Sequence, residues 1–132
     1  MVQALIQLLK TKSLSNITIT ELTERAGVSR MTYYRNYHSL DEIFSSYLKD
    51  LVEYQEGQVV SKTLVQNDAV SVTLFAFEKD EEISTHESGG DAFVTCLDGV
   101  GEITIDGVKY ELHEGESIVM PAKRPHAVMG KE

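Results

Sequence analysis

The spacing of apolar residues changes about half-way along the chain. Over the first 55 residues apolar side chains recur every three or four positions, clearly so in 2–9, which is the period of a helix with one buried face. From Gln58 onward they alternate with polar residues, as in 70–74, which is the period of a strand. The pattern therefore predicts helices followed by strands, with a domain boundary around Glu56 and Gly57.

A helix, a tight turn and a second helix are predicted in the middle of the helical half. Thr18 and Glu21 have the spacing of a capping box, which begins a helix. Gly27 follows that helix and readily adopts the left-handed conformation that ends one. Ser29 is suited to cap a second helix over 30–37. Two helices joined in this way are typical of a helix-turn-helix, whose second helix enters the major groove of DNA.

The second of these helices is predicted to have two distinct faces. Tyr33 and Tyr37 lie four residues apart and share one face, which we assign to the core. The other side chains offer guanidinium, hydroxyl and phenol groups, which bind phosphates and base edges. The predicted DNA-contacting residues are Ser29, Arg30, Thr32, Tyr34 and Arg35.

The sequence GVSRMTYYRNY, followed by SLDEIF, resembles the DNA-binding domain of the tetracycline-repressor (TetR) family of bacterial regulators. The resemblance covers about 2–54 and implies a helical head that binds double-stranded DNA. Two departures weaken the expected contact, because Leu40 stands where the family commonly has a phosphate-binding lysine and the N-terminal arm is short. The alternative is that the aromatic-rich helix is only a packed core helix.

The net charge of −9 is unevenly distributed. Residues 1–55 carry six basic and six acidic side chains, whereas 56–132 carry six basic and fifteen acidic ones. The acidic second half is therefore not expected to touch phosphates, and a neutral head predicts salt-sensitive binding that needs two heads per site.

Cys96 is the only cysteine, so no internal disulfide is expected. With no long apolar run or leader, a cytoplasmic protein is predicted.

The second half predicts short antiparallel strands. Alternating or apolar segments occur at 70–77, 93–97 and 117–120. The clearest hairpin is 102–112, because its centre is Asp106-Gly107, a dipeptide that accepts the positive φ angles of a two-residue turn. No helical pattern interrupts these strands, which favours an antiparallel barrel or a two-sheet jelly roll.

A second resemblance covers about 59–129 and is to the small single-domain cupins. Gly115, Pro121 and His126 match the second motif of that family, while His86 and Gly99 match part of the first. The resemblance implies a metal site of three histidines and one carboxylate, suited to a divalent transition metal. Only His86 and His126 remain as candidate metal ligands, because Ser88 and Ala92 occupy the other two positions, and Asp91 is expected on the opposite face.

Three uses of the predicted barrel stay open. It can be simply filled by its side chains, it can hold a metal ion, or it can bind a small organic molecule. Because small cupins usually have one more apolar strand after Met129, the barrel is expected to be truncated or to have an open sheet edge. The predicted pocket residues are His86, His126, Phe93 and Met120.

Together these observations predict a two-domain α+β protein: an all-α helix-turn-helix head of three or four helices at 1–55, and an all-β cupin barrel at 57–132. The favoured function is a homodimeric, DNA-binding transcription regulator whose barrel senses a small-molecule effector, without catalytic residues. The alternatives are a metal-dependent cupin oxygenase or isomerase with a vestigial helical arm, and a non-catalytic binding or assembly barrel.

Overall fold

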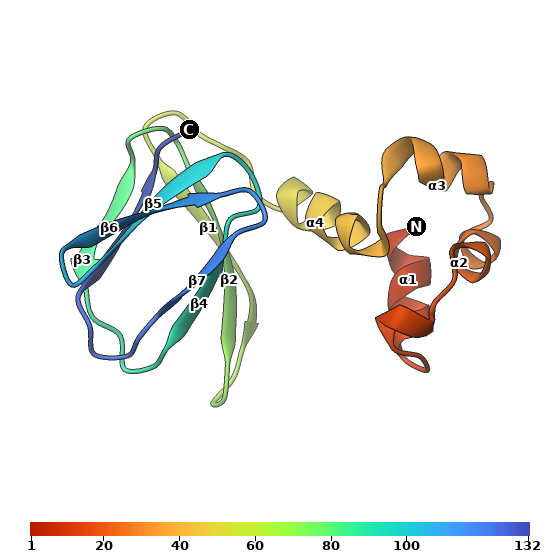
Figure 1. Ribbon diagram of the computed structural model, residues 1–132, viewed down its shortest axis with the longest axis horizontal. Coiled ribbons are helices and arrows are strands. Elements are labelled where there is room, and N and C mark those ends of the chain that lie inside the picture. Colours follow the sequence, from red (N-terminus) through yellow and green to blue (C-terminus); the bar gives the residue numbers. More distant parts are fainter. The chain divides into compact units, whose positions relative to one another are not determined.

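A computed structural model describes residues 1–132, which form two compact units, Met1–Asp50 and Leu51–Glu132 (Figure 1). The first unit is helical and the second consists of strands, as the change of period predicts. The division lies a few residues before the predicted boundary at Glu56 and Gly57. The helices are α1 (Val2–Leu9), the short 3-10 helix η1 (Leu14–Asn16), α2 (Ile19–Ala26), α3 (Arg30–Asn36) and α4 (Leu40–Asp50).

The core of the N-terminal unit explains the helical period. Helix α1 packs on α2 and α4, and α2 packs on α3. Leu5, Leu22 and Ile43 are completely buried where these helices meet, and Tyr33 of α3 is only 1% exposed. Tyr37 packs against the same cluster, so the predicted core face of α3 is confirmed. Burying such side chains stabilises each helix more than its intrinsic propensity does.

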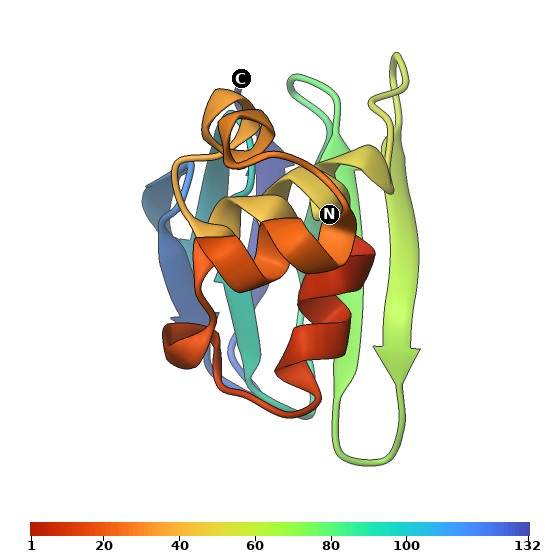
Figure 2. The same cartoon turned by 90° about the vertical axis from the view of Figure 1, so that its right-hand side faces the viewer.

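The second unit contains eight strands arranged in antiparallel pairs (Figures 1 and 2). Strands β1 and β2 form a long hairpin, drawn yellow-green and green in Figure 2. A four-stranded sheet has the order β3-β8-β5-β6, and β4 pairs with β7. The strands are β1 (Val59–Gln66), β2 (Ser71–Phe77), β3 (Glu82–His86), β4 (Ala92–Thr95), β5 (Val100–Ile105), β6 (Val108–His113), β7 (Ser117–Met120) and β8 (His126–Gly130).

The core of the second unit lies between the four-stranded sheet and the β4–β7 pair. Ile103 and Leu112 from the sheet are buried together with Met120 from β7. Two sheets that pack face to face in this way bury alternate residues of each strand. The predicted jelly-roll architecture therefore agrees with the observed packing.

Two local features of the strand unit bear on the sequence predictions. Asp106 and Gly107 have φ angles of 50° and 81°, which confirms the two-residue turn between β5 and β6. The last strand, β8, pairs with β3 on one side and β5 on the other. The final strand is therefore central in its sheet, and the sheet edges are β3 and β6.

Candidate functional site

The turn between α2 and α3 has a defined geometry that fixes where α3 begins. Gly27 ends α2 with a φ of 71°, and the Val28 amide donates to the carbonyl of Thr23 at 3.0 Å. Ser29 then caps α3, because its hydroxyl accepts a hydrogen bond from the Thr32 amide at 3.2 Å. The predicted start and end of α2 and the predicted cap of α3 are all confirmed. Three residues thus connect the two helices.

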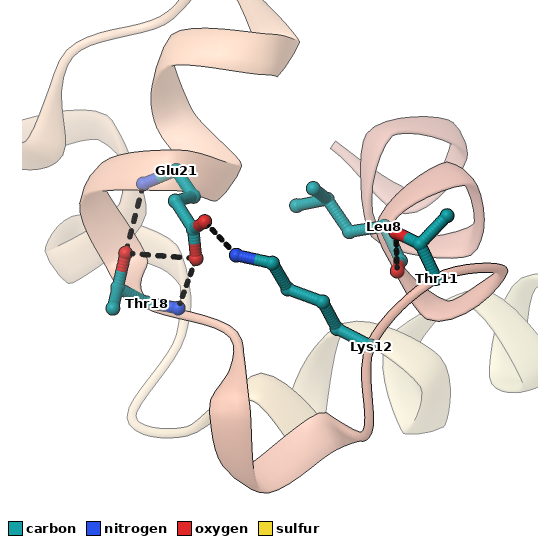
Figure 3. Close-up of polar contacts among 5 residues, drawn as sticks. All are labelled: Leu8, Thr11, Lys12, Thr18 and Glu21. Atoms are coloured by element: carbon teal, nitrogen blue, oxygen red, sulfur yellow. Dashed lines mark hydrogen bonds and ion pairs between the residues drawn. The ribbon is translucent and has the colours of Figure 1, made fainter.

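The start of α2 is held by the predicted capping box, shown in Figure 3. The Thr18 hydroxyl accepts from the Glu21 amide at 3.1 Å, and the Glu21 carboxylate accepts from the Thr18 amide at 3.1 Å. Lys12 forms an ion pair with the same carboxylate. The ammonium group of Lys12, followed by the Thr18 amide, lowers the pKa of Glu21. The positive charge of Lys12 is therefore neutralised within this unit.

The direction of each side chain of α3 follows from its position relative to the buried Tyr33. At about 100° per residue, the face opposite Tyr33 is occupied by Met31 and Arg35, which lie within about 20° of the outward direction. Both are exposed, Met31 by 61%. Met31 was not among the predicted contact residues. Its outward position follows from the helical period, because Met31 precedes the buried Tyr33 by two residues.

The predicted contact residues divide into two groups. Thr32 is half-buried and its hydroxyl lies 3.1 Å from that of Ser29, so both hydroxyls take part in the cap of α3. Arg30 and Arg35 are exposed and form none of the ion pairs in the structure. Tyr34 is 53% exposed, and its ring stands edge-on to that of Tyr33. The free groups are therefore two guanidinium ions and one phenol.

The second candidate site is a pair of histidines brought together from residues 40 positions apart. His86 at the end of β3 and His126 at the start of β8 are register partners, so their side chains lie on one face of the sheet. His126 is 2% exposed, whereas His86 is exposed. Their Nε2 atoms are 3.2 Å apart. The structure thus brings together the two predicted metal ligands.

The other ring nitrogens determine which hydrogens the pair carries. Nδ1 of His86 lies 2.9 Å from the carbonyl of Ser84, and Nδ1 of His126 lies 3.0 Å from that of Arg124. A carbonyl only accepts hydrogen bonds, so each Nδ1 carries a hydrogen. In neutral rings both Nε2 atoms then present lone pairs to each other. A single hydrogen or cation shared by the two atoms would satisfy both.

Comparison with known proteins identifies the strand unit. A family model described as "Cupin domain" matches residues 73–132. A conserved protein of unknown function from Streptococcus pyogenes is 46% identical, with a TM-score of 0.62 over 64% of this chain and 75% of that one. A cupin superfamily protein from Desulfitobacterium hafniense is 38% identical, with a TM-score of 0.61 over 64% and 77%. The chain belongs to the cupin family.

Further comparisons show how much of the chain, and of its relatives, the cupin similarity covers. A cupin 2 conserved barrel domain protein from Leptotrichia buccalis is 45% identical, with a TM-score of 0.61 over 62% of this chain, but the chain spans only 39% of that protein. None of the curated proteins matches the chain. The family match begins at residue 73, so it does not extend to the helices. No helix has the length and apolar character needed to cross a membrane.

The metal-binding set implied by the cupin resemblance is not assembled in this cupin domain. The Ser88 hydroxyl donates to the carbonyl of Gly90 at 2.7 Å, and Ala92 has no donor atom. The Asp91 carboxylate accepts from the Ala122 amide at 2.7 Å. No three side chains of His, Cys, Asp or Glu are placed to share one ion. The donor set therefore stops at His86 and His126 and does not fit a three- or four-ligand site.

The predicted pocket inside the cupin domain requires a correction at Phe93. Ala92 and Met120 are register partners, and Met120 is buried against Ile103. Phe93 follows Ala92, so it lies on the other face of β4, where it is 73% exposed. The prediction that Phe93 lines a pocket with Met120 is wrong, because adjacent strand residues point to opposite faces. Met120 itself packs in the core of the domain.

The remaining histidine and the single cysteine of the cupin domain lie outside the histidine pair. His113 is exposed and pairs with Glu111 at 2.9 Å, away from the histidine pair. Burial raises the pKa of the Cys96 thiol, which lies 3.4 Å from the carbonyl of Asp98. A thiol with a raised pKa is a weak nucleophile near neutral pH. A shallow hollow of about 200 Å³ is lined by residues that include Glu82 and Lys109 but neither His86 nor His126.

Proposed function

We propose that the chain is a transcription regulator that binds double-stranded DNA through α3. The observation that carries this proposal is the set of free groups on α3, where Arg30 and Arg35 are exposed and unpaired, Tyr34 is exposed, and Arg35 lies on the face opposite the buried Tyr33. The α2–turn–α3 segment serves as the helix-turn-helix, and α3 enters the major groove. The cupin domain serves as the small-molecule sensor and as the part that brings two chains together as a homodimer.

The distribution of charge supports this division of roles. The N-terminal unit has six basic and five acidic side chains, whereas Leu51–Glu132 has six basic and sixteen acidic ones. Phosphates repel a strongly acidic domain, so DNA contact falls to the helices. A nearly neutral head supplies few phosphate contacts, and two heads on one site compensate by doubling them.

Charge-neutralising variants test the proposal against a matched control. The wild-type protein is used to select duplexes from a random library, and binding is then measured by fluorescence anisotropy at low and physiological salt. Arg35→Gln is expected to weaken binding at least tenfold and to reduce the salt dependence, because a cation facing DNA is lost. Arg124→Gln removes the same charge from the cupin domain, where Arg124 pairs with Asp106 at 2.8 Å, and is expected to have no effect.

Two results would refute DNA binding through α3. One is the absence of any enriched sequence after selection at physiological salt. The other is an equal loss of affinity in Arg35→Gln and Arg124→Gln, which would indicate a general charge effect. Either result would leave the helices as a structural arm of the cupin domain.

A second candidate function is a binding cupin whose ligand contacts the histidine pair. The specific observation is the convergence of the two Nε2 atoms at 3.2 Å, with His126 buried. Such a pair accepts a cation or an N–H or O–H group of a small molecule. Metal analysis and ligand-induced thermal shifts of the wild type and of His126→Ala test it. Metal or ligand retained in full by His126→Ala would contradict it. The enzyme alternative has less support, because the donor set ends at two histidines.

A further inference from the structure

Met31 is an apolar side chain in a position where folding gives it no role. It points away from the buried Tyr33 and is 61% exposed, the largest exposure of any bulky apolar side chain in the N-terminal unit. It belongs neither to the buried cluster of that unit nor to the residues packed against it. A methionine at the centre of the outward face gains from burial only when something covers it.

The neighbours of Met31 indicate what covers it. Arg35 lies four residues later, so its guanidinium group projects from the same face of α3. An apolar group beside an unpaired cation matches the major-groove edge of DNA, which offers acceptor atoms on guanine and an apolar group only at the 5-methyl of thymine. A protein surface that covered Met31 would also need an acidic group for Arg35.

The helix geometry converts this pairing into a sequence preference. Four residues of helix advance about 6 Å along the axis, and base pairs are spaced by about 3.4 Å. Two side chains four residues apart therefore reach bases about two steps apart, when the helix lies along the groove. Arginine prefers the O6 and N7 atoms of guanine.

We propose that Met31 is a specificity-determining residue that contacts the 5-methyl group of a thymine, about two base pairs from a guanine bound by Arg35. This inference rests on the proposed function, since it assigns a base to a residue of the same DNA-binding face. It explains why the outward position carries methionine and not a second cation. It also predicts that the preferred half-site contains one thymine whose methyl group matters.

Replacing single thymines by deoxyuridine tests the proposal, because deoxyuridine lacks only the 5-methyl group and pairs in the same way. The duplex selected by the wild-type protein is used, with each thymine replaced in turn. At one position per half-site the wild-type affinity is expected to fall about three- to fivefold, the effect of losing one buried methyl contact. Met31→Ala is expected to bind the thymine duplex more weakly by a similar factor.

The decisive measurement combines both changes. In Met31→Ala the deoxyuridine duplex is expected to bind as well as the thymine duplex, because the contact is already lost. Met31→Leu is expected to keep part of the discrimination. The control is Ile6→Ala, which shortens another exposed apolar side chain of the same unit, on α1, and is expected to keep the full discrimination.

The failure of this inference is separable from the failure of the proposed function. If the wild-type protein selects and binds a duplex but no thymine position responds to deoxyuridine, or if Met31→Ala responds as strongly as the wild type, Met31 does not contact a thymine methyl while DNA binding stands. If the wild-type protein binds no duplex selectively, both are overturned. Circular dichroism of each variant checks that the exposed substitutions leave the helices intact.

Discussion

Gly27 allows the turn before α3 to be tested directly. Its φ of 71° lies in the left-handed region, and a Cβ atom added there would meet nothing within 4 Å. The cost of Gly27→Ala is therefore conformational and not steric. The left-handed conformation costs an L-residue roughly 1–2 kcal/mol. The smaller entropy of the unfolded alanine chain offsets about 0.4–1 kcal/mol. The free energy of unfolding of the N-terminal unit is expected to fall by about 1 kcal/mol.

Denaturant unfolding followed by far-UV circular dichroism measures this change, because the helices of the chain all lie in Met1–Asp50. Gly27→Asn is the matched variant, since asparagine adopts the left-handed conformation more readily than alanine. It is expected to lose less stability than Gly27→Ala. Gly89→Ala, at a glycine without a positive φ and with open space around it, controls for adding a methyl group elsewhere.

Two outcomes would refute the reasoning on Gly27. One is an alanine variant as stable as the wild type, which would mean that α2 does not end in a left-handed residue. The other is an asparagine variant less stable than the alanine variant, which would mean that side-chain bulk and not backbone conformation sets the cost. A confirmed loss would also predict weaker DNA binding if α3 is the recognition helix, because the turn sets the start of α3.

Three further predictions concern the helix cap, the strand faces and a tyrosine of the cupin unit. Thr18→Ala is expected to lower the free energy of unfolding of the helical unit by about 1 kcal/mol, and Thr18→Ser by much less, because the serine hydroxyl keeps the cap. Equal losses of unfolding free energy in the two variants, measured by denaturant unfolding, would contradict this. Phe93→Asp is expected to leave the thermal transition of the cupin domain nearly unchanged, whereas Met120→Asp puts a carboxylate into the core and unfolds the domain. Equal melting temperatures of the two variants would contradict the assignment of these residues to opposite faces. Burial and a hydrogen bond to Asp98 raise the pKa of Tyr54 to about 12. The stabilising contact is therefore fully present below about pH 10, the ordinary tyrosine pKa, and is lost as the pH rises toward 12. The ultraviolet difference titration between wild type and Tyr54→Phe should have its midpoint near pH 12, and a midpoint near 10 would exclude the contact.

Short-range features of this protein follow from the sequence alone. The capping box at Thr18 and Glu21, the left-handed Gly27 and the Asp106-Gly107 turn are all found where their residue types predict. Each depends on hydrogen bonds or φ preferences within about four residues, so the local sequence contains the required information. The assignment of Tyr33 and Tyr37 to one face of α3 follows from the helical period, whereas the burial of Tyr33 comes from packing against other helices.

The candidate sites depend on contacts that the local sequence does not contain. His86 and His126 meet because β3 and β8 pair in one register, and their ring hydrogens follow from carbonyls that the fold places against Nδ1. Phe93 faces outward because the register of β4 with β7 assigns Ala92, and not its neighbour, to the core. A one-residue shift of a strand reverses every side chain, so an apolar run by itself cannot show which residues face inward. Local hydrogen bonds and backbone preferences thus determined where the helices and turns begin and end, while long-range strand pairing, set by the packing of the whole core, decided which side chains meet.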